Sequence, residues 1–177
     1  MSTSTARRSS ATAGSSTSPE RDFDEFYTAH AHSLIGQIYA YVGDLPEAED
    51  LVAEAFCRAY ARWRTVGYYE NPLAWVRRVA WNLATSHHRR QTVIRRFLRR
   101  TRDEHSEGPQ PDRLDLRDAL RGLRQQHRKA VILYYLAQMT TTEIARQEGV
   151  SESTVRSWLS RGRAALQDKL RITEEEV

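Results

Sequence analysis

The sequence predicts an all-α protein made of two small helical domains joined by a short linker, with a helix-turn-helix in the second domain. Three observations support this prediction. Apolar residues recur at helical spacing along most of the 177 residues, and no alternating strand pattern of useful length occurs. Glycine (8) and proline (5) are scarce, which argues against a turn-rich β fold. An acidic stretch that contains prolines separates two basic regions.

Composition and cysteine usage exclude several classes of protein. The single cysteine, Cys57, excludes an internal disulfide framework and a cysteine-rich zinc site, and its apolar helical surroundings predict a buried, inert thiol. No apolar run approaches the ~20 residues that would span a bilayer, so we expect no membrane insertion. Residues 1–19 are rich in serine and threonine and lack a secretory apolar region, which predicts a disordered tail on a cytoplasmic protein.

Charge is distributed unevenly along the chain. Residues 65–102 carry 9 basic side chains against 1 acidic one, and residues 119–177 carry 10 against 7. Acidic side chains dominate the rest, with 9 against 6 basic ones in residues 1–64 and 6 against 2 in residues 103–118. Two basic blocks separated by an acidic stretch predict two binding surfaces on two modules.

Capping residues predict where the first helices begin and end. Asp22 opens a capping box that predicts the start of a helix, and Gly43 predicts its end. Asp44 and Glu47 predict the start of a second helix, whose apolar positions continue with helical spacing to Trp63.

The third predicted helix and the linker follow from turn residues. Residues 67–70 form a predicted loop, and Asn71 followed by Pro72 is a strong N-terminal signal for the next helix. In residues 91–112 we expect the first half to prolong this helix and the second half to be a linker. The predicted boundaries are 20–95 for the first domain, 96–112 for the linker, 113–172 for the second domain and 173–177 for an acidic tail.

The strongest local signal lies between residues 140 and 170. Thr140 opens a third capping box, for a short helix over 141–148, and Gly149 can take the positive φ of a tight turn. Ser151 can then cap a second helix, while the small Ala145 lets the two helices cross closely. This pattern is typical of a helix-turn-helix whose second helix enters the major groove of DNA, and an ordinary helical corner is the alternative interpretation.

The outer face of the second of these helices carries side chains suited to DNA. Arginine can pair bidentately with guanine, and serine can bond a base or a phosphate. Solvated surface charge is the alternative interpretation for each arginine. The candidate DNA-contacting residues are Ser153, Thr154, Arg156, Ser157, Ser160, Arg161 and Arg163. Trp158 is predicted either to pack inward or to touch a thymine methyl, and Gly162 is an unfavourable residue for the inside of a helix.

Three blocks of this sequence together resemble bacterial RNA polymerase sigma factors of the compact extracytoplasmic-function group. The block TTTEIARQEGVSESTVRSWLSRGRAALQDKL resembles their C-terminal DNA-binding region. The blocks DLPEAEDLVAEAFCRAYARW and NPLAWVRRVAWNLATSHHRR resemble their N-terminal core. The resemblance implies a promoter-specificity factor that binds core RNA polymerase, recognises the −35 and −10 elements of promoter DNA and promotes melting. It also implies an anti-sigma factor as a protein inhibitor.

The resemblance assigns roles to residues of the first domain. The acidic helix 44–63 matches the polymerase-docking helix, and an acidic face would orient a basic partner. Its candidate contacts are Asp44, Glu47, Asp50, Leu51, Glu54 and Phe56. The block 68–90 matches the part that opens the −10 element, where aromatic rings could stack on bases and arginines, Arg77 among them, could hold phosphates. Its candidates are Tyr68, Tyr69, Trp75, Arg78, Trp81, Asn82, Arg89 and Arg90, with Asn82 at the base-reading position and Trp75 equally compatible with a core position.

Two rival functions remain for comparison. A stand-alone helix-turn-helix regulator would use the first 90 residues as a sensing domain, yet these residues carry an acidic block followed by a basic aromatic one. An enzyme would need a supported catalytic or metal-binding set. The pair His30 and His32 lacks a nearby cysteine and favours an exposed helix face, while the pair His87 and His88 favours a phosphate contact or a hinge. The sequence therefore predicts no catalytic residue, metal, cofactor or small-molecule substrate.

Overall fold

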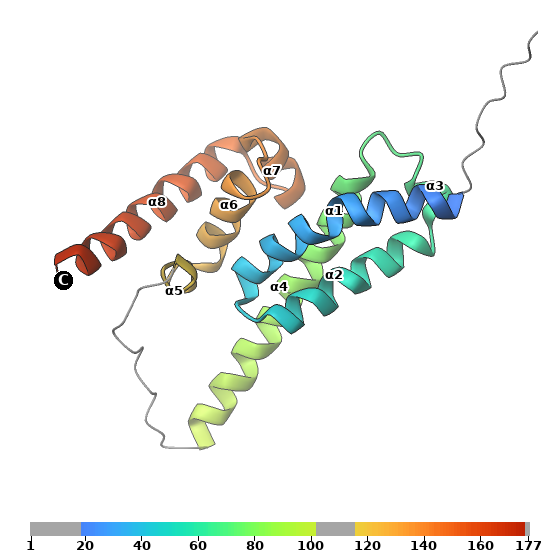
Figure 1. The fold of residues 1–177 in the computed structure, drawn as a ribbon. Helices are drawn as coiled ribbons and strands as arrows, with labels where there is room; N and C mark the ends of the chain where they lie inside the picture. Colours follow the sequence, from blue (N-terminus) through green and yellow to red (C-terminus); the bar gives the residue numbers. More distant parts are fainter. Residues whose placement is uncertain (1–18, 102–115, 176–177) are drawn as a thin grey trace, which may run out of the picture.

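A computed structural model describes residues 19–101 and 116–175 of the chain. These residues form eight helices and no strand, which confirms the predicted fold class (Figure 1). The helices are α1 (Pro19–Val42), α2 (Leu45–Tyr60), α3 (Trp63–Val66), α4 (Pro72–Thr101), α5 (Leu116–Arg121), α6 (Gln125–Tyr135), α7 (Thr141–Glu148) and α8 (Glu152–Glu175). Within this described part, no helix is long and apolar enough to cross a membrane.

The first domain is the bundle of α1 to α4. Helices α1 and α2 run side by side and α4 crosses both of them (Figure 1). Leu34 and Ile38 of α1, Val52 of α2 and Val76 and Ala80 of α4 are fully buried where these helices meet. Apolar residues three or four positions apart thus form the inward stripe of each helix, as their spacing predicts.

Local capping and turn residues explain several of the helix boundaries. Gly43 ends α1 with φ of +81°, and the carboxylate of Asp44 accepts a 2.9 Å hydrogen bond from the Glu47 amide at the start of α2. The Asn71 side chain likewise accepts a 2.9 Å bond from the backbone of the first turn of α4. The predicted start at Asp22 is wrong, because α1 already begins at Pro19.

In each domain, the predicted end of the last helix also needs correction. Helix α4 continues to Thr101, so the predicted linker from residue 96 begins inside a helix. Helix α8 continues to Glu175, so most of the predicted acidic tail is helical. The predictions for residues 1–18 and 102–115 lie outside the described residues.

The second domain is the group of helices α5 to α8. Helix α8 lies against both α6 and α7 (Figure 1). The core of the second domain contains Ile132 and Leu133 of α6, Ile144 of α7 and Val155 and Leu159 of α8, all buried. Gly162 lies where α6 and α8 cross, and a Cβ atom there would come within 2.7 Å of the Val131 methyl Cγ2. The close crossing therefore explains a glycine that helix propensity alone disfavours.

We expect Gly162→Ala to lower the free energy of unfolding by about 1 kcal/mol, although alanine gains about 1 kcal/mol of helix propensity. The added methyl group must displace the stiff, buried Val131, and overpacking costs ~1–3 kcal/mol. Gly36→Ala in α1 is the matched control, because a Cβ atom there meets open space and should stabilise by ~0.5–1 kcal/mol. Urea unfolding followed by circular dichroism measures both effects, and stabilisation by both variants would contradict this packing argument.

Candidate nucleic-acid interface

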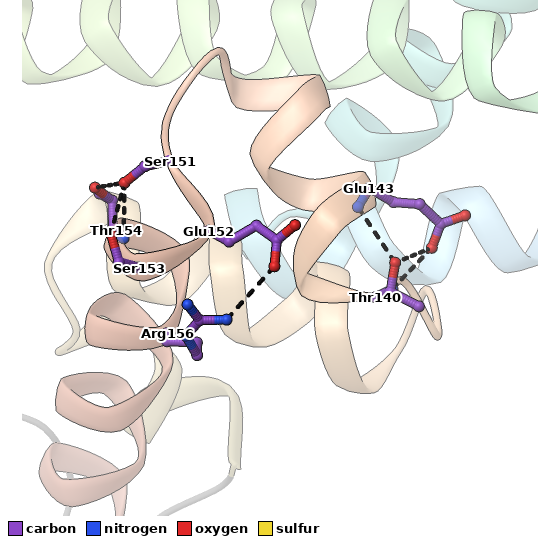
Figure 2. Close-up of polar contacts among 7 residues, drawn as sticks. All are labelled: Thr140, Glu143, Ser151, Glu152, Ser153, Thr154 and Arg156. Carbon is purple, nitrogen blue, oxygen red and sulfur yellow. Dashed lines mark hydrogen bonds and ion pairs between the residues drawn. The ribbon is translucent and has the colours of Figure 1, made fainter.

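The turn between α7 and α8 is fixed by two caps, shown in Figure 2. Thr140 donates from its backbone and hydroxyl to the Glu143 carboxylate at 2.8 Å, and its hydroxyl accepts from the Glu143 amide at 3.2 Å. These hydrogen bonds from Thr140 lower the pKa of the Glu143 carboxyl below its usual value. Gly149 takes φ of +68°, so the predicted capping box and left-handed turn are both confirmed.

A small hydroxyl cluster begins helix α8. The Ser151 hydroxyl accepts a 3.2 Å hydrogen bond from the Thr154 amide, which confirms the predicted cap. The same hydroxyl lies 2.8 Å from the hydroxyls of Ser153 and Thr154 (Figure 2). Ser151 therefore holds two of the candidate DNA-contacting side chains, Ser153 and Thr154, in the free protein.

The outward face of α8 presents the remaining candidates. Val155 and Leu159 point into the core, while Arg156, Ser160, Arg161 and Arg163 are exposed and Ser157 is half-buried. Arg156 makes an exposed ion pair with Glu152 at 3.4 Å, four residues earlier (Figure 2). Such exposed pairs contribute little, so the Arg156 guanidinium can exchange this partner for a base edge. Trp158 is half-buried against the core, as the packing interpretation predicted.

The candidate −10 face lies on the α3–α4 loop and on α4. Tyr68 is 89% exposed, Tyr69 is half-exposed, and Arg78, Asn82, Arg89 and Arg90 are exposed on α4. The structure contradicts the stacking role predicted for Trp81. Its side chain is fully buried, with the Tyr41 ring 5.0 Å away on one side and the Lys129 ammonium 5.4 Å from its ring.

Two further members of this block lie at a cleft shared with the second domain. Trp75 is half-buried and packs against the core, and Arg77 is half-buried beside it. Both residues line a cleft of about 560 Å³ together with Met139 and Glu143. Burial lowers the pKa of the Arg77 guanidinium, and the nearby Glu143 carboxylate acts in the opposite direction.

The acidic candidates on α2 differ in how exposed they are. Asp44, Asp50 and Glu54 are exposed, and Glu54 forms an ion pair with Arg58 at 2.7 Å. Glu47 is half-buried and lies 3.2 Å from Nδ1 of His87 on α4. The predicted acidic surface is therefore present on α2, but Glu47 faces another helix of its own domain.

The two apolar candidates on α2 differ in exposure. Leu51 is half-buried, whereas Phe56 is only 2% exposed and packs among the rings of Phe23, Phe26 and Tyr27 at 6.3, 5.8 and 4.9 Å. Direct contact between Phe56 and a partner is therefore contradicted by the structure. Cys57 shows the opposite error, because its predicted burial is wrong and its side chain is exposed.

Three of these four histidines contact other side chains in this fold. His30 packs against the Phe26 ring at 4.8 Å, and His32 is exposed. His87 and His88 lie inside α4 and not at a hinge, and His88 lies 5.7 Å from the Tyr41 ring. Within residues 19–101 and 116–175, no three histidine, cysteine or carboxylate groups cluster as metal ligands would.

These features define a class of protein: a two-domain helical protein with a helix-turn-helix in one domain and a basic aromatic face in the other. Residues 26–102 match the family described as Sigma-70 region 2, and residues 113–166 match Sigma-70, region 4. The chain belongs to the sigma-70 family of RNA polymerase sigma factors, in its extracytoplasmic-function group. It is a promoter-specificity factor, which binds core RNA polymerase, recognises promoter elements and promotes DNA melting.

Named relatives agree with this family. The chain is 32% identical over 152 residues to the RNA polymerase sigma-E factor of Streptomyces antibioticus, covering 84% of each protein. It is 31% identical to the ECF RNA polymerase sigma factor SigL of Mycobacterium tuberculosis, covering 85% of this chain and 88% of SigL. The fold is similar to that of the sigma factor RpoE in complex with the anti-sigma factor NepR from Bartonella quintana. That likeness has a TM-score of 0.70 at 23% identity and covers 86% of this chain and 98% of RpoE.

Proposed function

We propose that the exposed face of α8 reads the −35 element, that the exposed part of the α4 face binds and opens the −10 element, and that α2 docks on core polymerase. The observation that carries the proposal is the outward face of α8, where Arg156, Arg161 and Arg163 are exposed beside a helix N-terminus held by Ser151. A recognition helix needs such an arrangement to place side chains in the major groove. The rival regulator would need no polymerase-docking surface.

The boundaries of the two proposed modules are set by the first and last helix of each. We place the first module at residues 19–101 and the second at 116–175, where the sequence predicted 20–95 and 113–172. The proposed −10 contacts are Tyr68, Tyr69, Arg78, Asn82, Arg89 and Arg90, and the proposed polymerase contacts are Asp44, Asp50, Leu51 and Glu54. The proposed −35 contacts are Ser153, Thr154, Arg156, Ser157, Ser160, Arg161 and Arg163.

The partners of this proposal are macromolecules. Core polymerase and promoter DNA suffice for the activity, and no catalytic residue of the chain is required, so we assign no enzymatic reaction. An anti-sigma factor is a further proposed partner, because the structurally similar RpoE from Bartonella quintana was solved in complex with the anti-sigma factor NepR. The place of action is the cytoplasm, where bacterial polymerase and DNA meet.

Run-off transcription with core polymerase tests the function as a whole. Core polymerase with this chain should yield discrete transcripts from a subset of genomic fragments, whereas core polymerase alone should yield only non-specific initiation. A regulator without sigma activity would bind fragments in a gel-shift assay but produce no new transcript with core polymerase. That second result would replace the sigma assignment with the stand-alone regulator.

Charge reversal on α2 tests polymerase docking. We expect the double variant Asp50→Arg, Glu54→Arg to weaken binding to core polymerase about tenfold or more, because both side chains are exposed on the acidic face and would repel a basic partner. Equilibrium binding by fluorescence anisotropy measures the effect.

The double variant Asp24→Arg, Glu25→Arg on α1 serves as a matched control for this charge reversal, since both are exposed acidic residues on another helix. Equal losses in the two double variants would indicate a non-specific charge effect, and no loss in either would remove α2 from the docking surface.

A further inference from the structure

We propose that Arg124, at the start of α6, is a further DNA contact, and that it holds a backbone phosphate of the −35 element together with Arg161 of α8. This inference rests on the proposed function, in which α8 reads the −35 element. It adds another helix to the DNA-binding surface, because Arg124 directly precedes α6 and lies outside the helix-turn-helix of α7 and α8.

The first turn of α6 lies directly against the middle of α8. A Cβ atom at Gly162 would lie 3.6 Å from the Cβ atom of His127 and 3.5 Å from its carbonyl oxygen. His127 is the third residue of α6, and Gly162 directly follows Arg161 in α8. The glycine therefore lets the start of α6 approach the stretch of α8 that carries Arg161.

Two cations gather where these helices meet, and neither has an acidic partner. The positive charges of Arg161 and Arg124 both act on the His127 imidazole, so the three side chains form one cluster. Both arginines are exposed, and among the described residues neither makes an ion pair or a side-chain hydrogen bond. The next carboxylate along α8, Asp168, lies seven residues beyond Arg161, or about 10 Å along the helix axis. Two cations held together without an anion create a positive potential that favours the binding of one.

The N-terminus of α6 adds a helix dipole to this cluster. Arg124 occupies the N-cap position, and no side chain caps the helix there. The backbone amides of the first turn lack partners within the helix, as they do in every α-helix, and they carry partial positive charge. Such a helix N-terminus favours a phosphate group. A phosphate between the two arginines is therefore also stabilised by the dipole of α6.

The buried histidine of the cluster is sensitive to an anion at this position. His127 is 6% exposed, and its Nε2 atom has no hydrogen-bond partner among the described residues. Burial lowers the pKa of the His127 imidazole, and the charges of Arg161 on α8 and of Arg124 before α6 lower it further. A bound phosphate would oppose these two positive charges and raise the pKa again. DNA binding at this position therefore favours the protonated imidazole.

Salt-dependent DNA binding by the full chain tests the contact. The probe is a duplex that carries the −35 element of a promoter active in run-off transcription, and the variant is Arg124→Gln. Each phosphate contact contributes about −0.9 to the slope of log K against log salt concentration. Loss of one contact should therefore lower the affinity about eightfold at ~0.1 M salt and about threefold at ~0.3 M salt. Because a phosphate contact carries no base preference, duplexes with single substitutions should lose affinity by the same factors.

Two further variants separate this contact from a general charge effect. Arg124→Lys keeps the positive charge and should retain the salt slope of the parent. Arg146→Gln removes an exposed arginine of α7 that lines the cleft towards α4, and it should also retain the parent slope. Equal losses of affinity in Arg124→Gln and Arg146→Gln would overturn the contact, and so would a parent slope in Arg124→Gln.

The His127 imidazole supplies a second readout. NMR titration of its ring protons in the full chain should give a higher pKa with the −35 duplex bound than without it, and Arg124→Gln should reduce this difference. Because the pKa is raised in the complex, the affinity should rise as the pH falls towards that pKa, and His127→Gln should remove this part of the pH dependence. An unchanged pKa on DNA binding would overturn the proposal.

Inorganic phosphate distinguishes the two sources of the anion. If inorganic phosphate at millimolar concentration raises the pKa of His127 while Arg124→Gln binds the duplex as the parent does, the cluster binds a free anion and the DNA contact is wrong. Specific binding by the parent with unchanged binding by Arg124→Gln removes only this contact. A parent that binds the −35 duplex no better than an unrelated duplex would instead remove the proposed role of α8.

Discussion

Replacing Asn82 with alanine is expected to reduce open-complex formation about tenfold while leaving binding to an isolated −35 duplex unchanged. Asn82 is exposed on α4, directly after the buried Trp81, so the packing of the tryptophan turns the amide outward. Arg78 and Arg89 lie four and seven residues away and therefore share its face of the helix. An amide that bonds a base edge contributes ~1–3 kcal/mol, and a flipped base must recover the energy of unstacking.

A fluorescent base analogue in the −10 strand reports the opening. Arg78→Ala serves for comparison, because a phosphate contact should weaken binding to every sequence alike and lower the salt dependence. Asn82→Ala should instead lose discrimination at one base and keep the salt dependence of the parent. Equal opening by Asn82→Ala and parent on an active promoter would remove Asn82 from the −10 surface.

Local sequence signals predicted the capped helix starts well, because a cap depends on residues that are neighbours in the chain. The caps at Asp44, Asn71 and Thr140 and the left-handed Gly149 each depend on residues within four positions. The helix-turn-helix is a short-range motif of the same kind, so its bounds were predictable from residues 140–152. Asp22 is an exception among the predicted starts, since the chain before it has no signal that stops α1 from beginning earlier, and the ends of α4 and α8 were predicted too early.

Burial on the helices of the first domain was less predictable from periodicity. An amphipathic pattern gives the spacing of the buried residues but not the exact angle at which the helix faces the core. A prediction can therefore assign burial to the wrong one of two adjacent residues at the edge of the buried face. Phe56 and Cys57 show this on α2, where the structure buries the ring and exposes the thiol. Trp81 shows a second cause, because part of its cover is Lys129 from the other domain.

Contacts between the domains could not be predicted from either domain alone. Arg128 lies at an inward position of α6, four residues before the buried Ile132, and a single buried arginine at such a position is a detectable signal. Its partner is the backbone of Tyr41, 87 residues earlier in the chain. No local rule links a cation in one helix to the last carbonyls of another. The packing of the second domain against the end of α1 therefore becomes visible only in the three-dimensional structure.

The recognition helix is expected to separate base reading from phosphate binding between Arg156 and Arg161. The two residues lie five positions apart, so they point about 140° apart around the helix axis. Arg156 lies near the N-terminus of α8 beside Glu152, the end that enters the groove most deeply in this motif. Arg161 lies on the side of α8 that is near α6. Burial lowers the pKa of the His127 imidazole, and the positive charge of Arg161 lowers it further. We therefore expect Arg161, further along the helix, to contact mainly the DNA backbone.

Arg156→Ala should therefore cost ~1–3 kcal/mol on the preferred −35 element and relax the preference at one base pair. Arg161→Ala should weaken binding to all sequences alike and lower the salt slope by about 1. Binding to a library of single substitutions in the −35 element, at two salt concentrations, distinguishes these effects. A uniform loss in Arg156→Ala with lost selectivity in Arg161→Ala would reverse the two roles. If both variants bind every member of the library as the parent does, neither Arg156 nor Arg161 reads DNA, and both leave the proposed −35 surface.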